Sequence, residues 1–216
     1  MIKAVIFDFD GTLIDTNQLI YEGLQFLSMR YKGEQTPMPV LKALAGKPLT
    51  VQLSAVHPEK VDIMESQFQI WYRHNHHQKA RLFPGISEML SKLEGENLSM
   101  AIVTNNNRET LLMGLEHLGI LNYFDHHITR DDVAVSKPSP EGLLKSLTRL
   151  NLRPDEVLFV GDTENDVLAA ENAGVASVYV GWSEVDPRAF ERMPDFIIHH
   201  PDELLMLIQK YAYRVA

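Results

Sequence analysis

The stretch Ala4–Thr12, AVIFDFDGT, decides the fold that we predict for this chain. Residues Ala4–Phe9 form a nearly continuous apolar run, which is typical of a strand that is covered on both faces. Asp8 and Asp10 stand at the end of this run, and Gly11 permits the chain to turn away sharply. Acidic side chains at the end of a buried strand predict a parallel α/β sheet with a polar site at its carboxyl edge.

Further β-branched runs alternate with amphipathic stretches along the chain, which is the pattern of βαβ units. The other predicted strands are Ser99–Thr104, His127–Thr129, Val157–Val160 and Ala176–Val180. Apolar residues at helical spacing predict helices around residues 86–93, 111–118, 143–150, 164–173 and 204–208. The chain therefore reads as an α/β protein.

Residues from Asp15 to about Arg81 interrupt this alternation, and we find no strand pattern among them. Two groups of apolar residues there keep helical spacing: Ile20, Leu24, Leu27 and Tyr31, and then Val61, Met64, Phe68 and Trp71. We predict an all-helical insert at residues 15–81. The α/β core is then discontinuous and consists of residues 1–14 and 82–216.

Composition excludes several classes of function. The 216 residues include 20 basic and 29 acidic side chains, so the formal net charge is 20 − 29 = −9. An acidic protein is a poor partner for nucleic acid or an anionic membrane, so we expect neither. The absence of cysteine excludes thiol nucleophiles and thiolate metal sites. No run of 18 apolar residues and no signal peptide is apparent, so we expect a cytoplasmic protein.

Polar residues gather at the ends of three predicted strands. The first strand ends in Asp8-Phe9-Asp10, Thr104-Asn105 ends the second, and Asp162 follows Val157–Val160, with Asp166 one helical turn later. Lys137 lies in a Ser-Lys-Pro loop between them. Mg²⁺ prefers carboxylate ligands, so Asp8 and Asp162 are a candidate metal pair. A lysine can bridge an aspartate and a phosphate, so the set suits hydrolysis of a phosphate ester.

The sequence resembles the haloacid dehalogenase-like superfamily. Four motifs carry this resemblance in order and spacing across nearly the whole chain: Asp-x-Asp-Gly-Thr from Asp8, Thr104-Asn105, Lys137-Pro138, and Gly-Asp-Thr-x-x-Asp from Gly161. The resemblance implies a Rossmann-like, doubly wound parallel-sheet core with an inserted helical cap. It also implies an enzyme that transfers phosphoryl groups.

Roles for single residues follow from the resemblance alone. Asp8 would attack phosphorus and form an aspartyl-phosphate. Asp10 would protonate the leaving group and then activate water. Thr104 and Lys137 would bind the phosphoryl group, with the backbone or side chain of Asn105 assisting.

The resemblance also implies a Mg²⁺ cofactor. Its ligands would be Asp8, the backbone carbonyl of Asp10 and Asp162, with Asp166 in support. The substrate would be a small phosphorylated metabolite, of the phosphoglycolate, pyrophosphate or sugar-phosphate class. Within the cap, the turn Ala45–Pro48 is placed like the family's specificity loop, so Lys47 is a candidate for contact with a second anionic group.

Two alternatives to a phosphatase stay open. Dehalogenases of the family lack an acid at the Asp10 position, whereas β-phosphoglucomutase resembles this chain in core and cap. Such mutases carry a histidine around Leu19-Ile20, and this chain has none there, so a phosphatase of the phosphoglycolate phosphatase and pyrophosphatase group is favoured. The less favoured alternative is a phospho-acceptor signalling module, since receiver domains also gather acids, a threonine and a lysine around an aspartate.

Overall fold

The chain folds into two compact units. We describe a computed structural model that covers residues 1–45, 47 and 49–214. One unit comprises Met1–Asp15 and Leu82–Ala216, and the other, here called the helical unit, comprises Thr16–Arg81.

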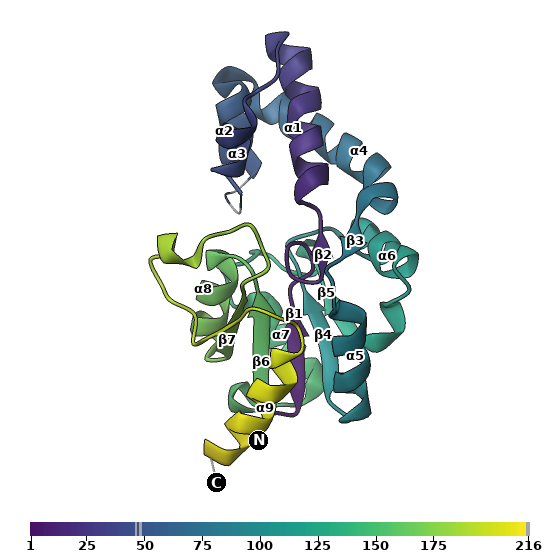
Figure 1. Cartoon of the computed structure of the whole chain (residues 1–216), viewed down its shortest axis with the longest axis vertical. Coiled ribbons are helices and arrows are strands. Elements are labelled where there is room, and N and C mark those ends of the chain that lie inside the picture. The colour runs from purple at the N-terminus through teal and green to yellow at the C-terminus, as the bar shows by residue number, and fades with distance from the viewer. Residues whose placement is uncertain (46, 48, 215–216) are drawn as a thin grey trace. The chain divides into compact units, whose positions relative to one another are not determined.

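The first unit is built on a six-stranded sheet in which every neighbouring pair of strands is parallel (Figure 1). Its strands are β1 (Ala4–Phe7), β4 (Ser99–Val103), β5 (His126–Ile128), β6 (Val157–Gly161), β7 (Ala176–Val180) and β8 (Phe196–Ile198). They lie in the order β5-β4-β1-β6-β7-β8. The chain thus builds outward on one side of β1 and then on the other, which makes the sheet doubly wound, as the sequence predicts.

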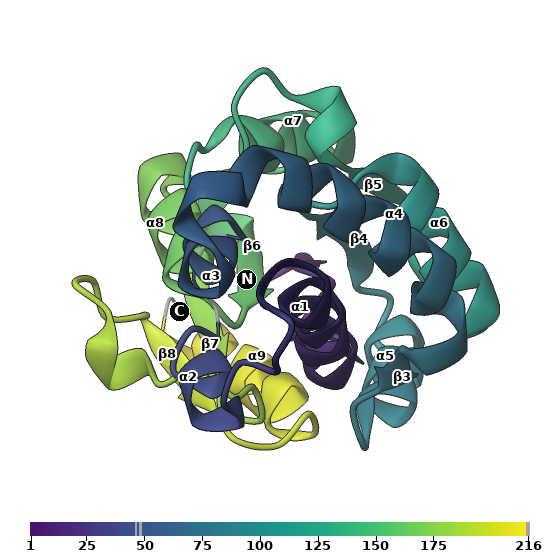
Figure 2. The same ribbon diagram turned by 90° about the horizontal axis from the view of Figure 1, so that it is seen from above.

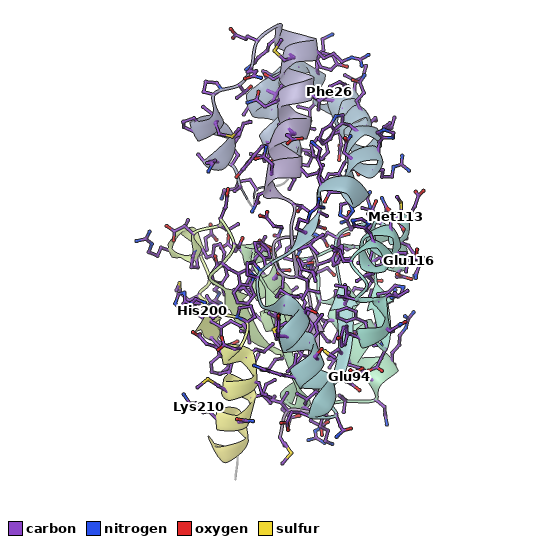
Figure 3. All side chains as sticks on the ribbon, turned by 45° about the vertical axis from the view of Figure 1, so that its right-hand side comes forward. Phe26, Glu94, Met113, Glu116, His200 and Lys210 are labelled. Carbon is purple, nitrogen blue, oxygen red and sulfur yellow. The ribbon has the colours of Figure 1, made fainter. Side chains whose placement is uncertain are left out.

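Helices cover both faces of this sheet. On one face α7 (Glu141–Leu150) and α8 (Glu164–Ala173) pack against each other and against β4, β5, β6 and β7. On the other face α5 (Ile86–Gly95) packs beside α9 (Glu203–Arg214), and the exposed residues Glu94 and Lys210 mark their solvent sides (Figure 3). The helix α6 (Arg108–His117) follows β4. Short 3-10 helices occupy Leu121–Tyr123, Arg130–Asp132, Pro154–Glu156 and Pro187–Ala189.

The core on the α7–α8 face explains why alternate residues of the strands are apolar. Ala4, Ile6, Val103 and Phe159 are almost fully buried there, because residues two apart in a strand point to the same face. Gly142 lets α7 approach the sheet closely, since a Cβ at this position would lie 2.8 Å from Val103. The strands that carry the polar residues are therefore rigidly held.

The helical unit has its own apolar core. It contains α1 (Asn17–Lys32), α2 (Met38–Lys42), α3 (Leu49–Val56), a 3-10 turn (Pro58–Lys60) and α4 (Val61–Lys79). Figure 2 shows α4 as a long curved helix, and it packs along α1. Leu24, Leu53, Met64 and Phe68 fill the centre. Gly23 brings α1 and α4 together, because a Cβ there would lie 2.7 Å from the Phe68 ring.

Two very short strands mark the chain positions where one unit gives way to the other. They are β2 (Ile14–Asp15) and β3 (Arg81–Leu82), which pair as a separate two-stranded sheet. Within the described ranges, the chain forms no helix long and apolar enough to cross a membrane.

The structure differs from the sequence prediction in four strands. The first strand ends at Phe7 rather than Phe9, because the backbone turns at once and Leu13 donates its N–H to the Phe9 carbonyl. Asp8 therefore stands just beyond the strand. The strand β8 is absent from the prediction, and so are β2 and β3, whose two residues are too short a run to show a period.

The fold predicts the stability effect of a substitution at the centre of the sheet. Ile6 of β1 has no exposed surface, so Ile6→Ala should lower the free energy of unfolding by about 2–5 kcal/mol, from lost apolar burial and the cavity left behind. Urea unfolding followed by circular dichroism measures this loss. Ile197→Ala in β8 is the control, because 41% of that side chain is exposed. A loss as large as that of Ile6→Ala would contradict this account of the core.

Candidate active site

The ends of the three central strands bring the polar residues to one edge of the sheet. β1 lies between β4 and β6, with Phe7 in register with Ile102 on one side and with Val160 on the other. Asp8 continues this register, since its N–H donates to the Val160 carbonyl at 2.8 Å. Strand order reverses at this place, and ligands of open α/β sheets bind in the crevice beyond such a point.

A buried ion-pair triad lies at this edge. The Nζ atom of Lys137 is 2.8 Å from Oδ1 of Asp8 and 2.6 Å from Oδ1 of Asp166. All three side chains are buried. Burial opposes the charge of Lys137, but the carboxylates of Asp166 and Asp8 outweigh it and hold the lysine pKa above its usual value. Lys137 is therefore a permanent cation beside Asp8.

The side chain of Asn105 holds the backbone of Lys137. Its Oδ1 accepts from the Lys137 N–H at 3.0 Å, and its Nδ2 donates to the Lys137 carbonyl at 3.2 Å. Both polar atoms of this amide are thus engaged with the lysine backbone. The sequence leaves open whether the backbone or the side chain of Asn105 assists phosphate binding. Because the side chain is engaged with Lys137, the geometry favours the backbone.

Asp166 connects the triad to the start of α8. Its Oδ2 accepts from the N–H of Thr163 at 2.9 Å and from the Thr163 hydroxyl at 2.6 Å, as an N-terminal capping box. Its Oδ1 already accepts from Lys137. The backbone at Gly161 comes so close that a Cβ there would lie 2.4 Å from Asp166. Three donors thus occupy three of the four acceptor sites of the Asp166 carboxylate.

Asp162 is held from two sides. Its Oδ1 lies 3.3 Å from the hydroxyl of Thr12, and its Oδ2 lies 2.8 Å from the hydroxyl of Ser183. Gly11, with φ +78°, passes so near that a Cβ would lie 2.2 Å from the carboxylate. Burial raises the pKa of Asp162 well above its usual value, and the charges of Asp166 and Asp8 raise it further.

The arrangement of charge fits a divalent cation. Among the described residues, carboxylate oxygens of Asp8, Asp162 and Asp166 all lie within 4.8 Å of one another. When the three are ionised, Lys137 leaves the cluster with a net charge of −3 + 1 = −2. Burial raises the pKa of Asp8 to about 7 even though Lys137 lowers it. A buried acidic cluster with this excess of charge, built from hard oxygen donors, suits Mg²⁺.

Asp10 joins the site through Asn106. The Nδ2 group of Asn106 donates to Oδ2 of Asp10, and the Asn106 N–H donates to the hydroxyl oxygen of Thr104 at 3.1 Å. Asp10 is half-buried, whereas Thr104 is buried. The Thr104 hydroxyl accepts one hydrogen bond in this arrangement and retains its own proton for a further acceptor.

The structure thus gathers the predicted residues of the core at one edge of the sheet. Lys137 contacts Asp8 and Asp166 directly, and carboxylate oxygens of Asp8, Asp162 and Asp166 lie within 4.8 Å of one another. Lys47 belongs to the helical unit, where its side chain is exposed and its carbonyl accepts from Gln52. Its neighbours Gly46 and Pro48 in the predicted specificity turn lie outside the described residues.

Three further residues contact this site that the sequence prediction does not include: Thr12, Asn106 and Ser183. Thr12 is the last residue of the first motif and Asn106 directly follows Thr104-Asn105, so proximity in sequence is a signal for them. Ser183 follows β7 in a loop without any motif, and only the tertiary fold brings it to Asp162.

A doubly wound parallel sheet with a buried acidic cluster and a lysine at its switch point is an arrangement typical of α/β enzymes. The family model for haloacid dehalogenase-like hydrolases matches residues 5–180 of this chain. The chain belongs to this family of hydrolases.

Individual relatives match over nearly the whole chain. The pyrophosphatase PpaX of Halalkalibacterium halodurans is 34% identical over 212 residues, which cover 96% of this chain and 97% of that protein. The PpaX of Oceanobacillus iheyensis is 32% identical over 208 residues, with 96% and 97% covered. A haloacid dehalogenase-like hydrolase structure from Streptococcus pneumoniae shares the fold, with a TM-score of 0.84, 23% identity, and 96% and 99% of the two chains covered.

The raised pKa of Asp8 predicts a pH dependence of stability for the metal-free protein. Because the folded state holds a proton on Asp8 up to a pH of about 7, whereas the unfolded chain releases it near its ordinary acidic pKa, stability falls as pH rises through this window. The Asp8 contribution to this fall is on the order of a few kcal/mol. Urea unfolding in EDTA, at pH values from roughly 4 to 8, measures this loss of stability. The range spans the ordinary pKa of an aspartate and the raised pKa of Asp8.

Asp8→Asn should make this decline shallower, because an amide does not titrate, while Asp162, whose pKa is also raised, keeps its own contribution. The exposed Asp202 provides the control, and Asp202→Asn should leave the slope as in the wild type. A wild-type slope in Asp8→Asn would show that the buried carboxyl is not the group that titrates.

Proposed function

We propose that this hydrolase is a Mg²⁺-dependent phosphatase that cleaves a small phosphorylated metabolite through an aspartyl-phosphate on Asp8. The observation that carries the proposal is the buried contact of Lys137 with Asp8, beside Asp162. A permanent cation beside a carboxylate, at the edge of the sheet where ligands bind, supports the choice of Asp8 as the nucleophile. Phosphoryl transfer requires both groups.

The reaction has two steps in this proposal. In the first, a carboxylate oxygen of Asp8 attacks phosphorus, the bond from phosphorus to the ester oxygen breaks, and Asp10 gives its proton to that leaving oxygen. In the second, Asp10 takes a proton from water, and the water oxygen attacks phosphorus and releases Asp8 as a carboxylate. The hydrogen bond from Asn106 keeps the Asp10 carboxyl in one orientation for both transfers.

The phosphoryl oxygens would be bound by groups that the fold has already ordered. Thr104 is buried and keeps a hydroxyl proton to donate. Lys137 donates as a compact charge, and Asn105 fixes the lysine backbone through both atoms of its amide. Donors fixed in advance stabilise developing charge without reorganisation, which is the principal electrostatic contribution to such catalysis.

Asp8, the backbone carbonyl of Asp10 and Asp162 would hold Mg²⁺, and Asp166 would act behind them. When bound, the cation neutralises charge on the phosphoryl group and on the cluster. The net charge of −2 described above supports this assignment, since a divalent ion balances it. Asp166 remains outside the ligand set in this proposal because three donors, the Lys137 ammonium and the N–H and hydroxyl of Thr163, already occupy three of its four acceptor sites.

The substrate class rests on the relatives and on the helical unit. The two relatives described above are named as pyrophosphatases, so we include pyrophosphate beside phosphoglycolate and sugar phosphates as candidate substrates. We propose that the helical unit acts as a cap and that the exposed Lys47 contacts a second anionic group. A panel of phosphorylated metabolites and pyrophosphate, scored by kcat/KM for the wild type and Lys47→Ala, separates these substrates.

Asp8→Asn tests the nucleophile. The amide is a poor nucleophile for phosphorus, so turnover of p-nitrophenyl phosphate in saturating Mg²⁺ should fall by at least about 1,000-fold. The control is Asp195→Asn, because Asp195 bonds to Ser177 at the start of β7, the amino end of that strand. Activity near wild type in Asp8→Asn would overturn the assignment. So would a rapid-quench experiment in which the wild-type protein shows no acid-stable phosphoryl label on Asp8.

Asp10→Asn tests proton donation. The rate at which Asp8 is phosphorylated should fall by about 100-fold or more with an alkyl phosphate, whose leaving oxygen needs a proton, and much less with p-nitrophenyl phosphate. The measurement is the rate of phosphorylation of Asp8 with each ester, by rapid quench. Equal losses for the two esters would remove Asp10 from the role of general acid.

A further inference from the structure

The loop that follows β7 contacts the acidic cluster through one side chain. Ser183 is half-buried, and its Oγ lies 2.8 Å from Oδ2 of Asp162. The catalytic steps proposed above do not use Ser183.

The direction of this hydrogen bond follows from the neighbours of Ser183. The N–H of Val185 donates to Ser183 Oγ at 3.4 Å. A hydroxyl has one proton and two lone pairs, so the serine accepts from Val185 and its proton is left for Asp162. Ser183 is thus a donor to a carboxylate.

The loop is anchored so that this donor keeps its place. The hydroxyl of Tyr179, a buried residue of β7, donates to the Val185 carbonyl. Trp182 donates its Nε1–H to the Thr12 carbonyl at 3.0 Å, and the Thr12 hydroxyl contacts Oδ1 of Asp162. The two segments on either side of Asp162 are therefore connected to each other as well as to the carboxylate.

We propose that Ser183 is a positioning residue, which turns the Asp162 carboxylate toward the divalent cation and holds it there. Each oxygen of a carboxylate has two acceptor sites. Ser183 occupies one on Oδ2 and Thr12 one on Oδ1, so one site on each oxygen stays open for a cation. Partners of this kind orient a ligand and strengthen metal binding. The inference rests on the proposed Mg²⁺ site.

The test compares Mg²⁺ affinity by isothermal titration calorimetry, with MgCl₂ and protein first treated with EDTA. Ser183→Ala should raise the Kd for Mg²⁺ by about 10-fold, because the carboxylate loses an orienting donor. Ser183→Thr restores the hydroxyl and should bind close to wild type. Ser91→Ala is the matched control, because it removes another hydroxyl with a single side-chain partner, Tyr123.

Kinetics supply a second readout, which a general loosening of the loop would not imitate. For Ser183→Ala, the activity should be low at limiting Mg²⁺ and should recover most of the wild-type kcat when Mg²⁺ is raised to saturation. An unchanged Kd in Ser183→Ala would overturn the positioning role alone, and so would an equal loss in Ser183→Thr. Failure of the wild type to bind Mg²⁺ would instead overturn the cofactor in the proposed function.

Discussion

The contact of the Lys137 ammonium with two carboxylates is the interaction on which the site depends. A buried charge is costly unless it is paired, and removing one partner of a buried pair typically costs several kcal/mol. Lys137 bonds to Asp8 and to Asp166 at the same time, from a loop whose backbone Asn105 holds. The relative positions of β1, the start of α8 and this loop are therefore set together. The geometry of one charged group organises three segments far apart in sequence.

The acidic cluster is assembled for ligand binding and at a cost in stability. The carboxylates of Asp8, Asp162 and Asp166 repel one another at short range, and a single lysine does not balance them. Burial raises the pKa values of Asp8 and Asp162, and the neighbouring carboxylates raise them further. A folded core tolerates it because residues such as Ile6 and Phe159 supply ample apolar burial around the strands. Strain of this kind is typical of functional sites.

Sequence reasoning predicts the sheet and most of the site because both depend on local patterns. The run at Ala4–Phe7 reads as a buried strand without any tertiary information, and residues at the ends of adjacent parallel strands must meet. Ser183 and the strand β8 are not predicted, since a loop serine carries no periodic signal and a three-residue strand is too short to show one. The hydrogen bonds of the Asn105 side chain to the Lys137 backbone are not predicted either, because the spacing of residues does not encode side-chain orientation.

The capping of α8 has a consequence for how such an enzyme loses activity under stress. One oxygen of Asp166 closes the first turn of the helix through Thr163, and the other oxygen holds the lysine. Helix ends fray more readily than whole domains unfold. When this turn opens, the aspartate leaves with it and the ammonium group loses a partner. Local opening of this one helix terminus is therefore enough to disrupt the lysine contacts while the sheet is still intact.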